Sequence, residues 1–398
     1  MQHSAMKHRF RQRLGQTSEK PMMFNASKAK GIYIYDEYGN PFIDLVAGVS
    51  VCNLGHQHPE IVQAVKEQID KHMHLMVYGE FIQPVQVELA DLLVKQLHPS
   101  LNTVYFVNSG SEAIEGAMKL AKRYTGKNHI VACKNAYHGS TQGALSLLGD
   151  EAFKRNYRPL LPGIDFICFN NTSDFYKITA QTAAVVIEPI QAEAGICIPD
   201  DDYLAALKQR CRDVGALLIF DEVQTGFGRT GKLFAHMHYN VIPDIMCVAK
   251  AFGGGMPLGA FIADKHIMDV FTKNPMHGHI TTFGGHPVSC AAALANLNVL
   301  LRDKLIEQVD AKASLYFDLL THPRIKKVWG KGLFIGIEME TEEEAARVME
   351  IGAKTGGFIT DLFLFKPNAF RIGAPLIITE KQIRESVKLI LNTLDKLD

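Results

Sequence analysis

The sequence predicts an α/β protein whose large domain has a mostly parallel central sheet flanked by helices, with a smaller α+β domain beside it. Three observations support this prediction. In the middle of the chain, short apolar runs rich in Val and Ile alternate with helical patterns, which is typical of parallel strands buried on both faces. The chain has 398 residues, more than one hydrophobic core usually organises. After about residue 295 the alternation gives way to longer helical patterns.

These patterns divide the chain into three segments. Residues 1–55 are expected to contribute to the small domain, residues 56–295 to form the large domain, and residues 296–398 to complete the small domain. In the first segment, Gly31–Asp44 is predicted to be a hairpin, with a turn at Tyr38, Gly39 and Asn40.

Six apolar runs in the large domain have the length of strands. They are Thr103–Val107, His129–Cys133, Asp165–Phe169, Ala183–Ile187, Ala216–Phe220 and Ile245–Ala249. Helices are predicted at Glu112–Tyr124 and Tyr203–Val214, each followed by a glycine that can end it. In the C-terminal segment, an isolated strand is expected at Gly332–Met339 and a final helix at Glu380–Leu397.

The charge balance and the cysteines narrow the classes of function. Basic and acidic residues both number 42, so the chain lacks the positive excess that binding to nucleic acid or an anionic membrane requires. The seven cysteines are scattered, with no CxxC pair. No apolar run reaches the roughly 18 residues of a membrane span. A soluble cytoplasmic protein with small-molecule partners is expected; the alternative is a targeting role for residues 1–18, which contain no acid.

Unusual residues follow three of the predicted strands, where ligands bind in parallel α/β sheets. The segment NSGSEA at 108–113 opens a helix with small residues and hydroxyls, which suits a phosphate group. The alternative is that Ser109 only caps the helix, with Glu112 completing a capping box. Asp221 ends an apolar strand, where a buried carboxylate needs a cationic partner. Lys250 ends another strand and enters a glycine-rich turn, a position where partial desolvation would make its amine reactive.

Together these motifs resemble the class III (ornithine, acetylornithine and GABA type) aminotransferases of fold type I, which depend on pyridoxal 5'-phosphate. The resemblance runs nearly end to end. Its most specific segments are NSGSEA at 108–113, YHGST at 137–141, EPIQAEAG at 188–195, FDEVQTGFGRTG at 220–231, AKAFGGGMPLGA at 249–260, TTFGGHP at 281–287 and RIGAPLIIT at 371–379.

The resemblance implies a role for each residue around the cofactor, which the large domain is expected to bind. Lys250 would carry the cofactor as a Schiff base, Asp221 would pair with the pyridine nitrogen, and Gln224 would bind the ring hydroxyl. Gly110 and Ser111 would hold the phosphate group.

Further residues are expected around the ring and across a subunit interface. Tyr137 would stack on one face of the cofactor ring and Val223 would pack on the other. In the family, the position of Thr282 reaches the phosphate bound by the neighbouring subunit. The resemblance therefore implies a homodimer whose active site is shared across the interface.

Arg371 matches the family position that binds a substrate carboxylate, and Glu193 matches the acid that can pair with it. We expect Glu193 to occupy Arg371 when an amino donor needs a different pose and to release it for a dicarboxylate such as 2-oxoglutarate. The chain departs from the family at Ser140, where ornithine and acetylornithine enzymes usually carry an Arg, so the identity of the amino donor is left open.

The expected reaction is ping-pong transfer of an amino group from an amino acid or ω-amine to a 2-oxo acid. Alternatives are decarboxylation, racemisation or an intramolecular amino shift with the same cofactor, or a non-catalytic protein on the same fold. The pairs His56/His58 and His277/His279 are interpreted as loop and cap residues, because their spacing demands no metal.

Overall fold

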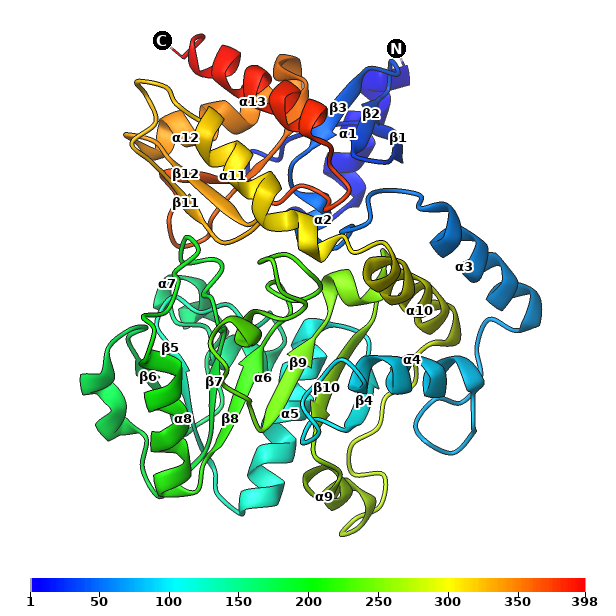
Figure 1. Cartoon of the computed structure of the whole chain (residues 1–398), viewed down its shortest axis with the longest axis vertical. Helices are drawn as coiled ribbons and strands as arrows, with labels where there is room; N and C mark the ends of the chain where they lie inside the picture. Colours follow the sequence, from blue (N-terminus) through cyan, green and yellow to red (C-terminus); the bar gives the residue numbers. More distant parts are fainter. Residues whose placement is uncertain (1, 398) are drawn as a thin grey trace.

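The computed structural model describes residues 2–397, with side chains from residue 6 onward. Figure 1 shows two lobes, the lower one built around the largest sheet and the upper one from the two ends of the chain. The α-helices are α1 (Gln2–Arg13), α2 (Ala47–Ser50), α3 (Pro59–Lys71), α4 (Pro84–Val94), α5 (Gly110–Thr125), α6 (Gln142–Ser146), α7 (Glu151–Lys154), α8 (Tyr203–Val214), α9 (Lys265–Met268), α10 (Pro287–Arg302), α11 (Val309–Leu319), α12 (Glu342–Ile351) and α13 (Glu380–Leu394).

The central sheet has seven strands in the order β4-β10-β9-β8-β7-β5-β6. They are β4 (Thr103–Val107), β5 (His129–Cys133), β6 (Ile164–Ile167), β7 (Thr182–Ile187), β8 (Leu217–Asp221), β9 (Ile245–Val248) and β10 (Gly259–Ala263). The six predicted strands are confirmed, with ends displaced by at most two residues. β10, which runs antiparallel to both neighbours, was not predicted, because its sequence GAFIA is short and follows directly on a glycine-rich turn.

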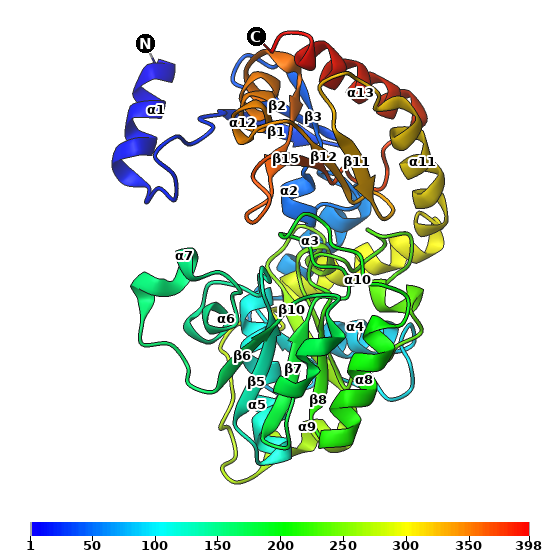
Figure 2. The same ribbon diagram turned by 90° about the vertical axis from the view of Figure 1, so that its left-hand side faces the viewer.

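Helices cover both faces of this sheet, as predicted. α5 packs against β7, β8, β9 and β10, whereas α8 packs against β7 and β8, and Figure 2 shows these two helices on opposite sides of the sheet. Both helices end at a glycine in the left-handed conformation, Gly126 with φ 69° and Gly215 with φ 66°. Strands buried on both faces explain why their sequences are almost continuously apolar.

The upper lobe contains two four-stranded sheets. One has the order β1 (Ala26–Lys30), β2 (Tyr33–Asp36), β3 (Pro41–Asp44), β13 (Phe358–Ile359), and the other has the order β11 (Lys327–Gly330), β12 (Ile335–Glu338), β15 (Ala369–Ile372), β14 (Asp361–Leu362). The predicted hairpin is confirmed as β2 and β3. Since β13 pairs with β3, both ends of the chain build this lobe.

One prediction in this lobe is wrong. The strand expected at 332–339 is β12, but it is not isolated, because β11 and β15 pair with its two edges. Both partners have only four residues and mix polar with apolar side chains, so neither shows a strand pattern of its own. The final helix is confirmed, although α13 ends at Leu394. The limits of the domains at residues 55 and 295 stay a prediction. Within residues 2–397, no helix has the length and apolar character to cross a membrane.

Candidate active site

A cavity of about 420 Å³ opens at the carboxyl ends of the parallel strands. Its lining comes from the loops after β4, β5, β7, β8 and β9, from the turn before β10, which runs the opposite way, and from Val51 at the end of α2. The lining residues are Val51, Asn108, Ser109, Gly110, Ser111, Tyr137, His138, Gly139, Glu188, Asp221, Val223, Gln224, Ala249, Lys250, Gly255, Met256, Pro257 and Leu258. The reversed direction of β10 therefore adds a wall to the site.

Seven of the ten residues predicted for the site line this cavity. They are Gly110, Ser111, Tyr137, Asp221, Val223, Gln224 and Lys250. Glu193, Thr282 and Arg371 lie outside its lining. Glu193 and Arg371 are nevertheless near enough to Lys250 for their charges to act on its amine.

The turn before α5 combines a helix cap with a small-residue cradle. Ser109 caps the helix, accepting the amide of Glu112 on its Oγ at 3.2 Å. The carboxylate of Glu112 does not return to Ser109 as in a capping box, because it accepts the amide of Asn108 at 2.6 Å. The first amides of α5 have no partners within the helix and face the cavity end of the fold. The cap by Ser109 is therefore confirmed without the predicted capping box, and the phosphate site stays a prediction, since the cap leaves the helix N-terminus available to an anion.

Gly139 shows how closely the neighbouring loop approaches this cradle. Its φ is 127°, and a Cβ placed there would lie 2.1 Å from Oγ of Ser111. The amide of Ser140 donates to the same Oγ at 3.3 Å. Only glycine allows this approach, so the loop after β5 packs directly against the first turn of α5.

Asp221 is buried and has a partner that the sequence did not indicate. Nδ1 of the buried His138 lies 2.8 Å from Oδ2 of Asp221, and the amide of Val223 donates to Oδ1 at 2.9 Å. Burial alone would lower the pKa of His138, but the hydrogen bond and charge of Asp221 raise it above its ordinary value. His138 lies in the segment YHGST at 137–141, which the sequence analysis singled out. Its contact with Asp221 of β8 could not be predicted, because this contact depends on the order of strands in the sheet.

Lys250 is half-buried at the end of β9, where its Nζ donates to Oε1 of Gln224 at 2.9 Å. Its backbone has φ 50°, an uncommon left-handed conformation for a lysine. Burial lowers the pKa of Lys250, and the charge of Arg371 lowers it further, while Glu193 acts in the opposite direction. A lysine held in this way is more often neutral, and therefore nucleophilic, than a lysine in water.

Glu188 is a further buried acid of the cavity that the sequence did not single out. Its carboxylate accepts the amides of Tyr137 at 3.3 Å and Ala192 at 2.8 Å. Burial raises the pKa of Glu188 to about 7. The negative charge of Asp221 also raises this pKa, whereas the charge of His138 lowers it. The side chain therefore ties the loop after β7 to the loop after β5.

Three predicted residues lie apart from the cavity lining. Arg371 donates from Nη1 to Oε1 of Glu193 at 2.7 Å, so these two side chains do meet. Thr282 is exposed. Its neighbour Thr281 accepts a hydrogen bond on Oγ1 from Nδ2 of Asn108 at 3.0 Å.

The histidines that lie close together in the sequence have contacts other than a metal: Nε2 of His56 lies 2.7 Å from Oδ2 of Asp44. Across residues 2–397, there is no group of three or more metal-binding side chains.

These residues fit pyridoxal phosphate. The buried Nε2 of His138 has no hydrogen-bond partner, the start of α5 suits a phosphate, and Lys250 supplies an amine of lowered pKa. A mostly parallel sheet with lysine, acid and phosphate cradle at one edge defines an enzyme of the fold type I class that uses this cofactor.

Comparisons with known proteins identify the family. The model of the class III aminotransferases matches residues 14–394. The chain is 40% identical to an acetylornithine aminotransferase of Methanopyrus kandleri, over 79% of this chain and 81% of that protein. It is 39% identical to a putrescine aminotransferase of Pectobacterium atrosepticum, over 92% and 81%. A structure of Toxoplasma gondii ornithine aminotransferase, with partial occupancy of pyridoxal phosphate at its active site, matches with a TM-score of 0.90, 28% identity and coverage of 98% and 93%.

The chain belongs to the class III aminotransferases. It is an enzyme that depends on pyridoxal phosphate and transfers an amino group from an amine or amino acid to a 2-oxo acid. Its substrates are small molecules.

Proposed function

We propose that the cavity at the edge of the central sheet is where this transfer takes place, with Lys250 as the catalytic residue. The observation that carries the proposal is that Lys250, Gln224 and Asp221 line one cavity beside the N-terminus of α5. When bound there, pyridoxal phosphate supplies a carbonyl for the amino group and a ring that accepts electrons. Lys250 binds the cofactor through Nζ, and once this amine is free it takes a proton from the substrate and returns it.

The other lining residues hold and orient the cofactor in this proposal. Asp221, kept in place by His138, pairs with the ring nitrogen and keeps it protonated. Gln224 binds the ring hydroxyl, and Tyr137 and Val223 pack against the ring. The phosphate is bound by amides and hydroxyls at the start of α5, at Gly110 and Ser111.

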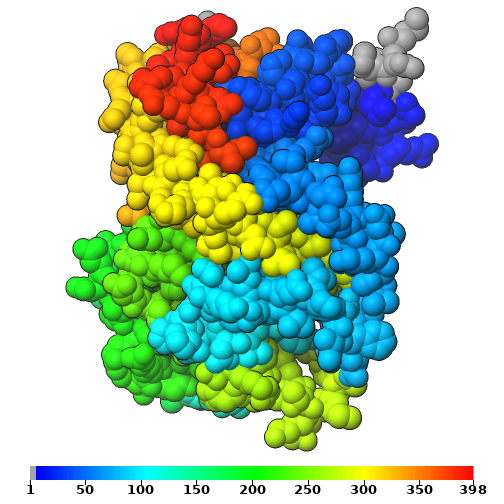
Figure 3. Space-filling model, turned by 45° about the vertical axis from the view of Figure 1, so that its right-hand side comes forward, coloured from blue at the N-terminus to red at the C-terminus, as the bar shows by residue number. Residues whose placement is uncertain are grey.

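We propose further that the active enzyme is a homodimer with a shared site. Large apolar side chains are exposed on the segment between α3 and α4 and around Thr282, including Met73 at 62%, Ile82 at 90% and Phe283 at 55% exposure. Figure 3 shows part of this surface, with the blue to cyan segment lying beside the yellow α10. An apolar surface of this kind is typical of protein interfaces, and Thr282 lies within it, free to reach a phosphate bound by the partner subunit.

The cellular location stays a prediction. All seven cysteines are free, which is consistent with a reducing compartment such as the cytoplasm.

A half-reaction screen tests the function. Holoenzyme is mixed with single amino donors without a 2-oxo acid, and loss of the cofactor's visible absorbance is followed; the donors are ornithine, N-acetylornithine, lysine, 4-aminobutyrate and 1,4-diaminobutane. At least one donor should bleach the absorbance, and 2-oxoglutarate should restore it. If no donor does so, or if a bleached sample releases carbon dioxide instead of a carbonyl product, transamination is not the reaction of this site.

A further inference from the structure

Arg371 is held by two carboxylates, whereas the family resemblance indicated one. Asp361 accepts Nε of Arg371 on Oδ1 at 2.6 Å and Nη2 on Oδ2 at 2.6 Å, while Glu193 accepts only Nη1. The ring of Phe363 lies 5.3 Å from Cζ of the same guanidinium. One positive and two negative side chains leave this cluster with a formal charge of −1.

The cluster adjoins the cavity through the loop that follows β7. Glu188, on this loop, lines the cavity, and Glu193 lies five residues further along the loop. Glu193 is joined to the β14–β15 hairpin, because its Oε2 accepts the amide of Leu364 at 3.2 Å. Charges on Glu193 and Arg371 both act on the amine of Lys250, so the cluster lies within electrostatic reach of the atom at which the amino donor would react.

The two acids hold Arg371 unequally. Asp361 makes two parallel hydrogen bonds along one edge of the guanidinium, a geometry stronger than the single bond made by Glu193. Glu193 is therefore the acid that a substrate carboxylate displaces. Even after this displacement, Asp361 continues to neutralise Arg371, so an incoming carboxylate gains less than it would from a free guanidinium.

The described residues that line the cavity offer little positive charge to compensate for this neutralised Arg371. Among the described residues that line the cavity, only His138 and Lys250 can be positively charged, and both are committed to other partners. At Ser140, where related enzymes usually carry an arginine, the hydroxyl lies 3.0 Å from that of Tyr137. The charges of this subunit's cavity and of the Arg371 cluster thus favour the binding of amines without a carboxylate over the binding of amino acids.

We propose that Asp361 is a positioning residue that sets the charge of the substrate pocket, favouring diamines and other donors without a carboxylate and weakening the binding of dicarboxylates. This inference rests on the proposed function, because it assumes that substrates bind in the cavity beside Lys250.

The test is Asp361→Asn in the holoenzyme, since this change keeps the size of the side chain and an oxygen acceptor while removing the charge. Glutarate, a dicarboxylate that cannot be transaminated, should bind about tenfold more tightly by titration calorimetry, as expected for a newly unneutralised cation. With the diamine 1,4-diaminobutane as donor, KM should rise severalfold while kcat stays within about twofold, a split that a general loss of folding does not produce.

Two variants serve as controls. Asp361→Glu keeps the charge and should retain the low glutarate affinity of the parent. Glu338→Gln, at the end of β12, removes a 2.9 Å ion pair to Lys366 of the same β14–β15 hairpin without touching Arg371, and should leave glutarate binding unchanged. An unchanged glutarate affinity in Asp361→Asn, or the same change in Glu338→Gln, overturns the inference. Because glutarate binding needs no turnover, this result is independent of whether the screen of amino donors succeeds.

Discussion

At the scale of single residues, the site consists of buried or half-buried charged groups, each paired with a partner. His138 is hydrogen-bonded to Asp221, and Gln224 to Lys250. Glu193 and Asp361 form ion pairs with Arg371. Because an unmatched buried charge is costly, these contacts fix where each side chain points before any ligand arrives.

Asp221→Ala should slow the half-reaction by a factor on the order of 10²–10⁴, because an unprotonated ring accepts electrons poorly. Cofactor should still bind through Lys250. Single-turnover absorbance measurements with the best donor of the screen give the rate. Asp165→Asn, an exposed acid on β6, is the matched control and should react like the parent. A parental rate in Asp221→Ala would remove this residue from the mechanism.

The sequence predicted seven of the residues that line the cavity, since they lie at the ends of strands, or in the loops after them, whose apolar runs are easily recognised; their roles toward the cofactor stay a prediction. The partners were missed for a physical reason. His138 meets Asp221 only because β5 and β8 lie on either side of β7 in the sheet, and Asp361 meets Arg371 only because β14 pairs with β15. Such contacts depend on strand pairing, which a single sequence does not reveal.

At the scale of elements, polar side chains fasten the segments that join the sheet to its surroundings. His56 illustrates this in the upper lobe: its ring bonds to Asp44 of β3, whose other oxygen accepts the amides of Val46 and Ala47. This contact joins the end of β3 to the chain that leads into α3.

The ion pair of His56 should make stability depend on pH. Its hydrogen bond to Asp44, with a smaller contribution from Cys52, raises the pKa of His56 from 6.5 to about 10. Because the folded state holds the proton more tightly, the stabilisation is complete below pH 6.5 and is lost as the pH rises toward 10. A hydrogen bond to a charged group contributes about 2 kcal/mol. Urea unfolding should show the free energy of unfolding of the parent falling between these pH values relative to that of His56→Asn; parallel curves would contradict the assignment.

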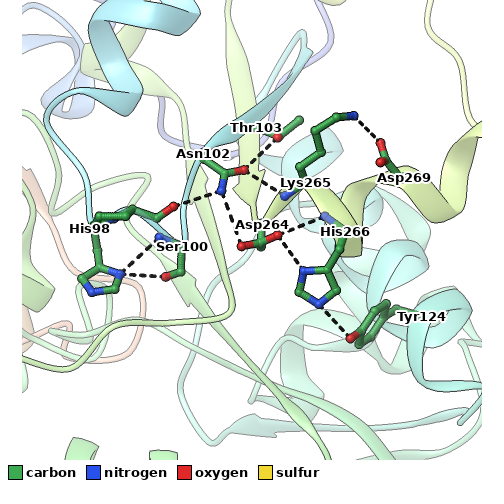
Figure 4. A network of polar contacts seen from close by, with 10 residues as sticks. His98, Ser100, Asn102, Thr103, Tyr124, Asp264, Lys265, His266 and Asp269 are labelled. Atoms are coloured by element: carbon green, nitrogen blue, oxygen red, sulfur yellow. Dashed lines mark hydrogen bonds and ion pairs between the residues drawn. The ribbon is translucent and has the colours of Figure 1, made fainter.

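A second network lies at the opposite end of the central sheet from the site. Figure 4 shows Asp264 capping α9 and contacting His266, whose Nε2 lies 3.0 Å from the hydroxyl of Tyr124. Asn102, just before β4, accepts the amide of Lys265 at 2.8 Å. The network therefore holds the end of β10 against α5 and the start of β4.

Asp264→Ala should lower the free energy of unfolding by about 1 kcal/mol, the usual cost of losing a helix cap. The KM values of both substrates should stay at those of the parent, since the substitution lies far from the cavity. Chemical denaturation and steady-state kinetics measure the two effects. A raised KM with unchanged stability would show that this network acts on the site and is not simply structural.

At the scale of the whole molecule, the two lobes differ in how far their architecture could be predicted from the sequence. The fold class was predictable from the alternation of strands and helices along the chain, and the comparisons confirm it. The upper lobe was less predictable, because its strands have two to five residues and its sheets join distant segments, as β3 and β13 do.

Ile82→Lys should separate the proposed dimer, because it places a charge on the exposed apolar surface, where Ile82 is 90% exposed. Sedimentation should show a monomer with at least tenfold weaker cofactor binding, since a bond to phosphate from Thr282 of the other subunit would be lost. Thr282→Val should weaken cofactor binding while the dimer persists. Tyr176→Lys, also at an exposed side chain but on another surface, is the control and should behave like the parent. A monomeric parent with full activity would rule out the shared site.

The most direct test of the central assignment is to locate the covalent bond between the cofactor and the protein. Holoenzyme is reduced with borohydride and digested, and the peptides are sequenced by mass spectrometry. We predict a single pyridoxyl group on Lys250, and no such group on any lysine of Lys250→Ala, which should also lack transaminase activity. A pyridoxyl group on another lysine of the parent, or full activity of Lys250→Ala, would contradict the account.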